Sequence, residues 1–153
     1  FFITTLESER PKFRKVIEAI PEDKLEHKVH DKSRELGSLA SQLAIQWYGI
    51  SGVITSGAPS MDSHLSKSAP KQEMLSEFDK NFDQMMKDLA AVSDDDWENS
   101  EASMGEFWKD KKYNMAWGFL FDAIHHRGQL STYLRGLGEK VPAIYGPSAD
   151  AQS

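Results

Sequence analysis

The sequence predicts an all-α protein built as a four-helix bundle with an irregular C-terminal tail. Four long segments carry apolar residues at steps of three and four, the spacing that lines one face of a helix. No run of useful length shows the alternating pattern of a half-buried strand. Because none of these helices could bury its apolar face alone, we expect them to pack together as a bundle.

The first two helices are predicted over Phe2–Ile20 and Arg34–Thr55. Pro11 lies inside the first. Because proline lacks an N–H and clashes with the preceding turn, we expect a kink or a new helix start there. The residues expected to face the core are Leu6, Phe13, Val16, Ile17 and Ile20 in the first helix, and Leu36, Leu39, Leu43, Trp47, Ile50 and Ile54 in the second.

The third and fourth helices are predicted over Pro70–Val92 and Lys112–Leu137. Pro70 is a start signal, and Gly138 is expected to cap the end of the fourth helix. Gly128 is interpreted as permitting a close approach between helices. The inward-facing residues are predicted to be Leu75, Phe78, Phe82, Met85, Leu89 and Val92, and then Trp117, Phe121, Ile124, Leu130, Tyr133, Leu134 and Leu137, which form an unusually wide apolar face.

The connections differ in character. The link over residues 21–32 is polar, and residues 56–69 are rich in Ser, Gly and Pro, as in a surface loop. Ser93 is expected to cap a one-turn helix that ends near Trp97. Residues 99–111 are predicted to be an irregular link that is long enough for a crossover. The tail from Glu139 contains two prolines and is not expected to be helical.

Size and composition limit the classes of function. A chain of 153 residues predicts one domain over 1–153. The net charge of −6 gives no basic footprint for a nucleic acid, so no nucleic-acid partner is expected. The chain has no cysteine, and therefore no disulfide and no thiolate ligand. Its apolar runs are too short to span a membrane, and the charges within residues 1–20 are unlike a signal peptide, so the expected location is cytoplasmic.

Asp122 and His126 are the most informative pair of polar residues. They stand four positions apart in the fourth helix, and residues at this spacing share one face. An aspartate and a histidine arranged in this way can chelate a divalent ion, or the carboxylate can simply bind the imidazole. From spacing alone, the second interpretation is favoured.

Two segments resemble the DinB (DinB/YfiT-like) family. One is His125–Gly138 with the following Lys140–Asp150; the other is Ser33–Ala44, which is similar to that family's second-helix motif. The resemblance implies a four-helix bundle, often a homodimer, in which three side chains hold a divalent metal. The family usually supplies one histidine from the second helix and a His-x-x-x-His pair from the last.

Carried onto this chain, the resemblance implies a metal site formed by Gln42, Asp122 and His126. Asp122 is a credible replacement for histidine, because carboxylate oxygen binds Zn, Ni or Mn readily. The neutral amide of Gln42 is a weak ligand. The resemblance therefore leaves two alternatives: a weakened metal site, or a relic site in which these side chains bind one another and no ion.

Two functional hypotheses follow from the resemblance. The first is a metal-dependent thiol-S-transferase that uses a low-molecular-weight thiol such as bacillithiol or mycothiol, with His30 or Tyr145 assisting proton movement. The second is a non-catalytic, stress-associated homodimer that acts through its surface or a small-molecule pocket. Of the remaining candidates, Arg127 is expected to form an ion pair, and His27 and His64 are expected to be solvated loop residues.

Overall fold

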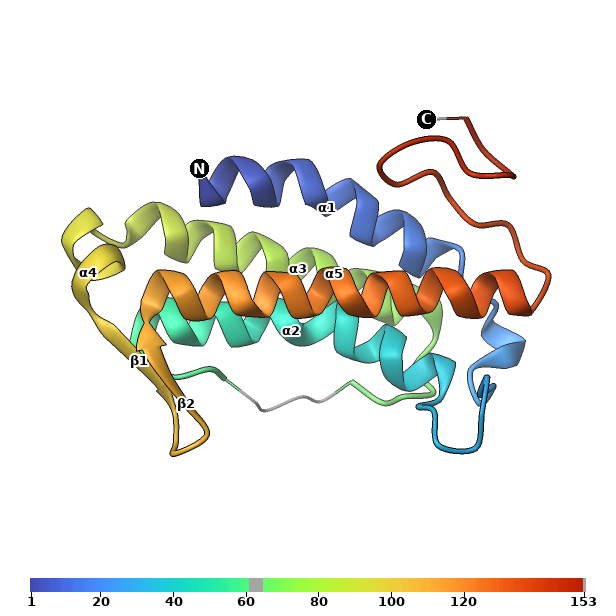
Figure 1. Ribbon diagram of the computed structural model, residues 1–153, viewed down its shortest axis with the longest axis horizontal. Coiled ribbons are helices and arrows are strands. Elements are labelled where there is room, and N and C mark those ends of the chain that lie inside the picture. Colours follow the sequence, from blue (N-terminus) through green and yellow to red (C-terminus); the bar gives the residue numbers. More distant parts are fainter. Residues whose placement is uncertain (61–64, 153) are drawn as a thin grey trace.

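The computed structural model describes residues 1–60 and 65–152, so His64 lies outside the described residues. Four long helices form a bundle (Figure 1), as the sequence predicts. They are α1 (Phe2–Glu18), α2 (Leu36–Ser56), α3 (Lys71–Ala91) and α5 (Lys112–Gly136). The shorter elements are η1 (Glu22–Lys24), α4 (Asp94–Asn99), β1 (Glu101–Met104) and β2 (Trp108–Lys111).

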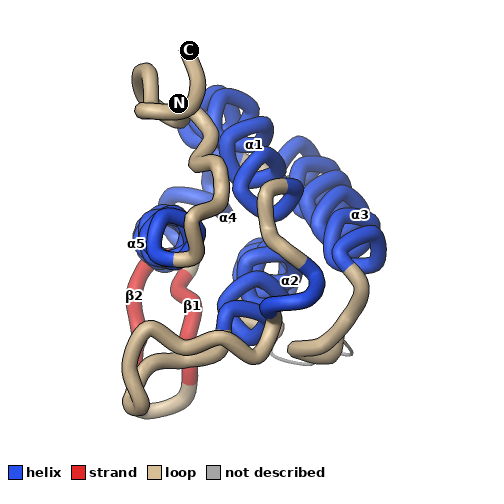
Figure 2. The backbone as a smooth tube through the Cα atoms, turned by 90° about the vertical axis from the view of Figure 1, so that its right-hand side faces the viewer, coloured by secondary structure: helices blue, strands red, loops and turns tan. Residues whose placement is uncertain are grey.

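The core is organised around Trp47 of α2. Its indole is fully buried and meets the rings of Phe13 and Phe82, with centroids 4.8 Å away in each case. Its Nε1 donates a hydrogen bond of 3.0 Å to the carbonyl of Leu43, so burial leaves no indole N–H unpaired. Viewed along the bundle in Figure 2, α2 lies between α3 and α5, and its most extensive contacts are with these two helices.

The crossover lies elsewhere than predicted. Helices α2 and α3 run in the same direction (Figure 1), as the hydrogen bond from Ser51 near the end of α2 to Asp88 near the end of α3 also indicates. The chain therefore returns along the bundle between α2 and α3. Residues 99–111 stay at one end of the bundle, where the next helix begins.

The prediction of an irregular link over residues 99–111 was also wrong. Strands β1 and β2 pair antiparallel, with Ala102 opposite Asp110, and Gly105 takes a positive φ of 61° in the turn. Four residues per strand are too few to display an alternating pattern. The hairpin docks on the bundle through a small second core formed by Val53, Ala102 and Met115.

Two other expectations need correction, and a third is narrowed. Helix α1 continues through Pro11, so of the two alternatives expected there the new helix start is excluded and the kink is not. The carbonyl of Glu7 has no helical partner, because Pro11 has no N–H. Both residues are exposed, so water can replace the missing hydrogen bond. Phe121 is 62% exposed, because α5 buries a different stripe that includes Leu120, Ala123 and Arg127. A Cβ placed at Gly128 would meet no atom within 4 Å, so this glycine does not serve a close helix approach.

The predicted end of the last helix is confirmed. Gly138 has a φ of 77°, which an L side chain rarely adopts. The N–H of Glu139 reaches the carbonyl of Leu134 at 2.9 Å, and the N–H of Gly138 reaches that of Arg135 at 3.1 Å, which is the Schellman pattern. In the described part of the chain, no helix combines the length and apolar character needed to cross a bilayer.

Gly37 provides a test of the packing at the start of α2. A Cβ at this position would overlap the carbonyl oxygen of Lys67 and lie 3.1 Å from the Cβ of Leu25. We predict that Gly37→Ala lowers the free energy of unfolding by about 1–3 kcal/mol. Gly128→Ala is the matched control, and it should raise this free energy by about 0.5–1 kcal/mol, because alanine stiffens an open helical position. Urea denaturation measures the free energy of unfolding of both variants, and equal changes in the two would contradict the close packing at Gly37.

Candidate functional site

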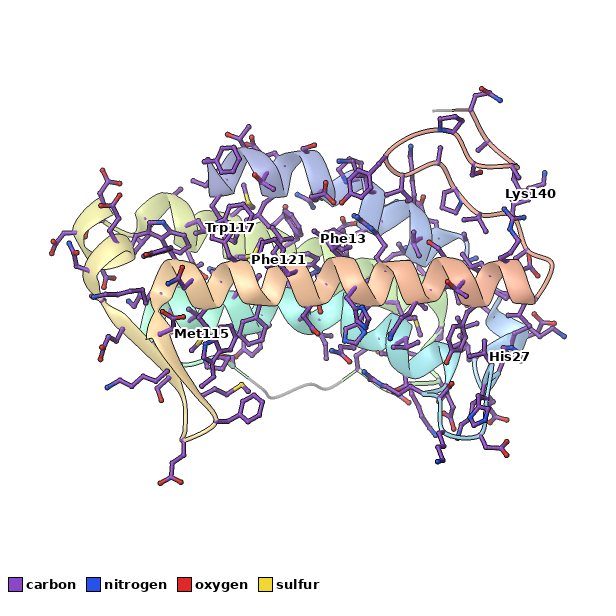
Figure 3. All side chains as sticks on the ribbon, viewed as in Figure 1. Phe13, His27, Met115, Trp117, Phe121 and Lys140 are labelled. Atoms are coloured by element: carbon purple, nitrogen blue, oxygen red, sulfur yellow. The ribbon has the colours of Figure 1, made fainter. Side chains whose placement is uncertain are left out.

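A pocket opens between the loop that precedes α2 and the C-terminal half of α5. Its volume is about 390 Å³, within the range of small-molecule sites. The lining residues are Val29, Lys32, Ser33, Arg34, Leu39, His126, Gln129, Thr132 and Tyr133. The hydroxyl of Tyr133 donates a 2.6 Å hydrogen bond to the carbonyl of Arg34, which fastens the loop to α5. His27, labelled in Figure 3, packs edge-on against the Tyr133 ring.

His126 reaches this pocket from α5. Its Nε2 lies 3.3 Å from Oδ2 of Asp122, and its Nδ1 lies 2.9 Å from Oε1 of Gln129. The amide nitrogen of Gln129 is in turn 2.9 Å from Nε2 of His125. When Nδ1–H donates to Gln129, the Nε2 lone pair faces Asp122, which is the orientation of a histidine ligand held by an outer partner.

Gln42 approaches the same region from α2 but is engaged by another residue. Its amide oxygen accepts a hydrogen bond from the guanidinium of Arg34. The second terminal nitrogen of Arg34 donates to the carbonyl and hydroxyl of Ser38, at 3.3 and 3.0 Å. Among the described residues, Gln42 makes no hydrogen bond to Asp122 or His126.

The antiparallel pairing of α2 and α5 determines which turn of α5 lies opposite Gln42. Lys112 at the start of α5 binds the carbonyl of Ile54, and Tyr133 near its end binds that of Arg34. Between these two fixed points, Gln42 lies level with the turn of α5 that carries Asp122 and His126. The three residues implied by the resemblance are therefore on facing turns, with Arg34 holding one of them.

These side chains do not fit a tight three-ligand metal site. The amide oxygen of Gln42 already accepts from a guanidinium, and a divalent cation would be repelled by that fixed positive charge. Within residues 1–60 and 65–152, no three His, Cys, Asp or Glu residues come together as a metal-binding group. Asp122 and His126 remain as two donors on consecutive turns of α5.

Gln46 is a residue that the sequence reasoning missed. It follows Gln42 by one turn of α2 and is 9% exposed, yet neither its amide nitrogen nor its amide oxygen has a hydrogen-bond partner in the described part of the chain. Leaving a buried amide unpaired is costly, which makes such a residue informative. Its spacing of four from Gln42 is the signal that could have found it.

Tyr145 lies in a different cluster, on the side of α5 that faces α1. Its hydroxyl binds Oε2 of Glu9 at 2.8 Å and accepts from Arg127. Arg127 pairs with the same Glu9 oxygen at 2.6 Å, which confirms the predicted ion pair, and Lys12 binds the other oxygen at 2.7 Å. Tyr145 thus ties the tail to α1. His30 is exposed, and its Nδ1 accepts from the backbone N–H of Lys32.

The surroundings of Glu9 alter its acidity. Burial raises the pKa of this carboxyl, but the hydrogen bonds from Lys12, Arg127 and Tyr145 together outweigh burial and hold the pKa below its ordinary value of 4.5. The ionised form therefore stabilises the fold. This contribution is complete above about pH 4.5 and is lost as the pH falls through the pKa of the folded state.

Comparison with known proteins agrees with this architecture. Residues 117–152, which cover most of α5 and the tail, match the DinB family. A DinB-like protein from Bacillus cereus is similar in fold, with a TM-score of 0.76 and 16% identity over 94% of this chain and 95% of that one. The DinB-like protein YjoA from Bacillus subtilis gives a TM-score of 0.73 and 16% identity over 93% and 95%.

No curated protein sequence matches the chain significantly. The family match at the C-terminal end and the shared bundle over nearly the whole length together confirm the resemblance. The chain has the four-helix-bundle fold of these DinB-like proteins, and its C-terminal part matches the DinB family.

Glu9 gives a testable acid dependence. We predict that Glu9→Gln lowers the free energy of unfolding at pH 7 by about 3–5 kcal/mol, because Arg127 is left buried without its counter-charge. When the free energy of unfolding is measured between pH 5 and pH 3, at intervals of about one pH unit, it should also fall less in the variant than in the wild type. Glu7→Gln, at an exposed position of α1, is the control. If the free energy of unfolding of the wild type and of Glu9→Gln changed with pH in parallel, the stabilising role of ionised Glu9 would be contradicted.

Proposed function

We propose that this chain is a small-molecule-binding DinB-like bundle that works without a tightly held metal. The single observation that supports this most is the hydrogen bond from Arg34 to Gln42, the position at which the resemblance implies a histidine ligand. The guanidinium supplies positive charge where the family would place a cation. In this proposal, Zn, Ni or Mn binds only weakly, and the pocket beside His126 is the functional surface.

A second candidate is the metal-dependent thiol-S-transferase, and one observation favours it. Two ligands at about 2.1 Å from a tetrahedral ion lie roughly 3.4 Å apart. Nε2 of His126 and Oδ2 of Asp122 are separated by 3.3 Å, which is compatible with that spacing. This candidate requires Gln42 to release Arg34. It would also need a proton acceptor other than Tyr145, whose hydroxyl is engaged by Glu9 and Arg127.

Metal content separates the two candidates. The wild type, Gln42→His and Gln42→His/Arg34→Gln are incubated with Zn, Mn and Ni, dialysed, and measured by elemental analysis. We predict well under one ion per chain in the wild type. The double variant should hold about one ion, because it restores an imidazole and removes the competing cation.

Stoichiometric metal in the wild type that is lost in His126→Ala would overturn the proposal and support the transferase. A double variant that binds no more metal than the wild type would show that Arg34 is not what weakens the site. Circular dichroism of each variant confirms that the helical fold is retained.

We further propose that the chain forms a homodimer through an aromatic patch of Phe1, Trp117 and Phe121. Phe121 is 62% exposed, and its ring centroid is 5.7 Å from that of Trp117, which is 5.9 Å from that of Phe1. Figure 3 shows Trp117 and Phe121 beside each other. Large exposed aromatic rings are typical of surfaces that a partner covers, and the family resemblance makes a second copy the expected partner.

Light scattering tests this interface. We predict that the wild type is a dimer and that Phe121→Ser raises its dissociation constant by about tenfold or more without changing the helical content. Phe107→Ser is the control, because Phe107 is 83% exposed but lies in the hairpin turn. A wild type that stays monomeric at millimolar concentration would contradict the proposal.

A further inference from the structure

Arg34 differs from the other arginines of this acidic chain. The sequence has five, and Arg10, Arg14, Arg127 and Arg135 each contact a carboxylate. In the described part of the chain, Arg34 contacts only neutral acceptors, which belong to Gln42 and Ser38. In a protein of net charge −6, a guanidinium held in place without a counter-charge points to an anionic ligand.

The hydrogen bonds of Arg34 leave donors available. A guanidinium has five N–H groups, and three of them are used here, one toward Gln42 and two toward Ser38. Two remain, including the N–H of Nε. Because Gln42 and Ser38 fix the plane of the group, less conformational entropy is lost when an oxyanion binds.

The rest of the pocket adds donors and an apolar wall. The ammonium of Lys32 and the hydroxyl of Ser33 line it and make no hydrogen bond to another described residue. Val29, Leu39 and the ring of Tyr133 supply the apolar surface. Of the nearby carboxylates, Glu35 pairs with Lys67 at 2.7 Å, and Asp122 lies 3.3 Å from Nε2 of His126. None of the lining residues carries a carboxylate.

We propose that this pocket binds a small organic oxyanion, a carboxylate or a phosphate monoester with an apolar body, and that Arg34 and Lys32 contact the charged group directly. This inference rests on the proposed metal-independent function and names its class of ligand. The oxyanion occupies the cationic side of the pocket, and its apolar part lies against Val29, Leu39 and Tyr133.

Calorimetric titration of the full chain with defined probes tests the ligand class. Phenyl phosphate and benzoate are compared with inorganic phosphate and with neutral benzamide. At least one of the two aromatic anions should bind about tenfold more tightly than either inorganic phosphate or benzamide. The stronger of the two identifies the charged group as phosphate or carboxylate. Equal affinity for benzamide, or for inorganic phosphate, would overturn the proposal.

Three charge variants locate the site. Arg34→Gln should weaken binding of the preferred probe by about tenfold or more, and Lys32→Gln by several-fold. Lys28→Gln removes the same charge from the same loop outside the pocket lining, and it should change affinity less than about twofold. Equal losses in all three variants would indicate general electrostatic attraction and overturn the assignment.

The same samples distinguish failure of this inference from failure of the proposed function. A wild type without stoichiometric metal that also binds neither anion would leave the metal-independent proposal standing and refute the oxyanion site. Because Arg34 and Lys32 are both exposed, the variants are expected to fold, and thermal melts in the absence of probe verify this.

Discussion

The buried ion pair between Glu9 and Arg127 is the constraint on which the rest of the structure depends. These two side chains are 6% and 2% exposed, so neither charge can be left without the other. The pair fixes the rotation of α5 about its own axis. Adjacent helical residues point about 100° apart, so directing Arg127 toward α1 turns His126 to the pocket. The same pair binds Tyr145 and so positions the tail.

The candidate site is shaped by the loop before α2 as much as by the helices. That loop places Arg34 against Gln42 and connects to α5 through the Tyr133 hydroxyl. The helical framework of a DinB-like bundle is kept, and Arg34 places a positive charge beside Gln42, the position at which the resemblance implies a metal ligand. A guanidinium presents directed N–H donors, whereas a metal ion presents open coordination positions, so the two would select different ligands.

The sequence was sufficient for the helical framework, because burial in a bundle follows a period that residues such as Leu43, Trp47 and Ile50 display directly. The prediction that Phe121 faces the core was wrong, because α5 is apolar on several sides and its buried stripe includes a charged residue, Arg127. The spacing of Asp122 and His126 predicted their proximity. The hydrogen bond from Arg34 to Gln42 depends on a loop conformation that no periodic pattern encodes. The hairpin strands are too short to show an alternating pattern in the sequence.

The two hydrophobic cores differ in how they join the fold. The hairpin is held by Val53, Ala102 and Met115, and within residues 1–60 and 65–152 the partly buried Phe119 packs against both this cluster and the main core. Trp108 of β2 lies over Gly118, where any larger residue would displace its ring. The hairpin is therefore packed on the bundle through a cluster separate from the one around Trp47. A substitution in this cluster would act first on the hairpin and on the start of α5, and would reach Trp47 only indirectly.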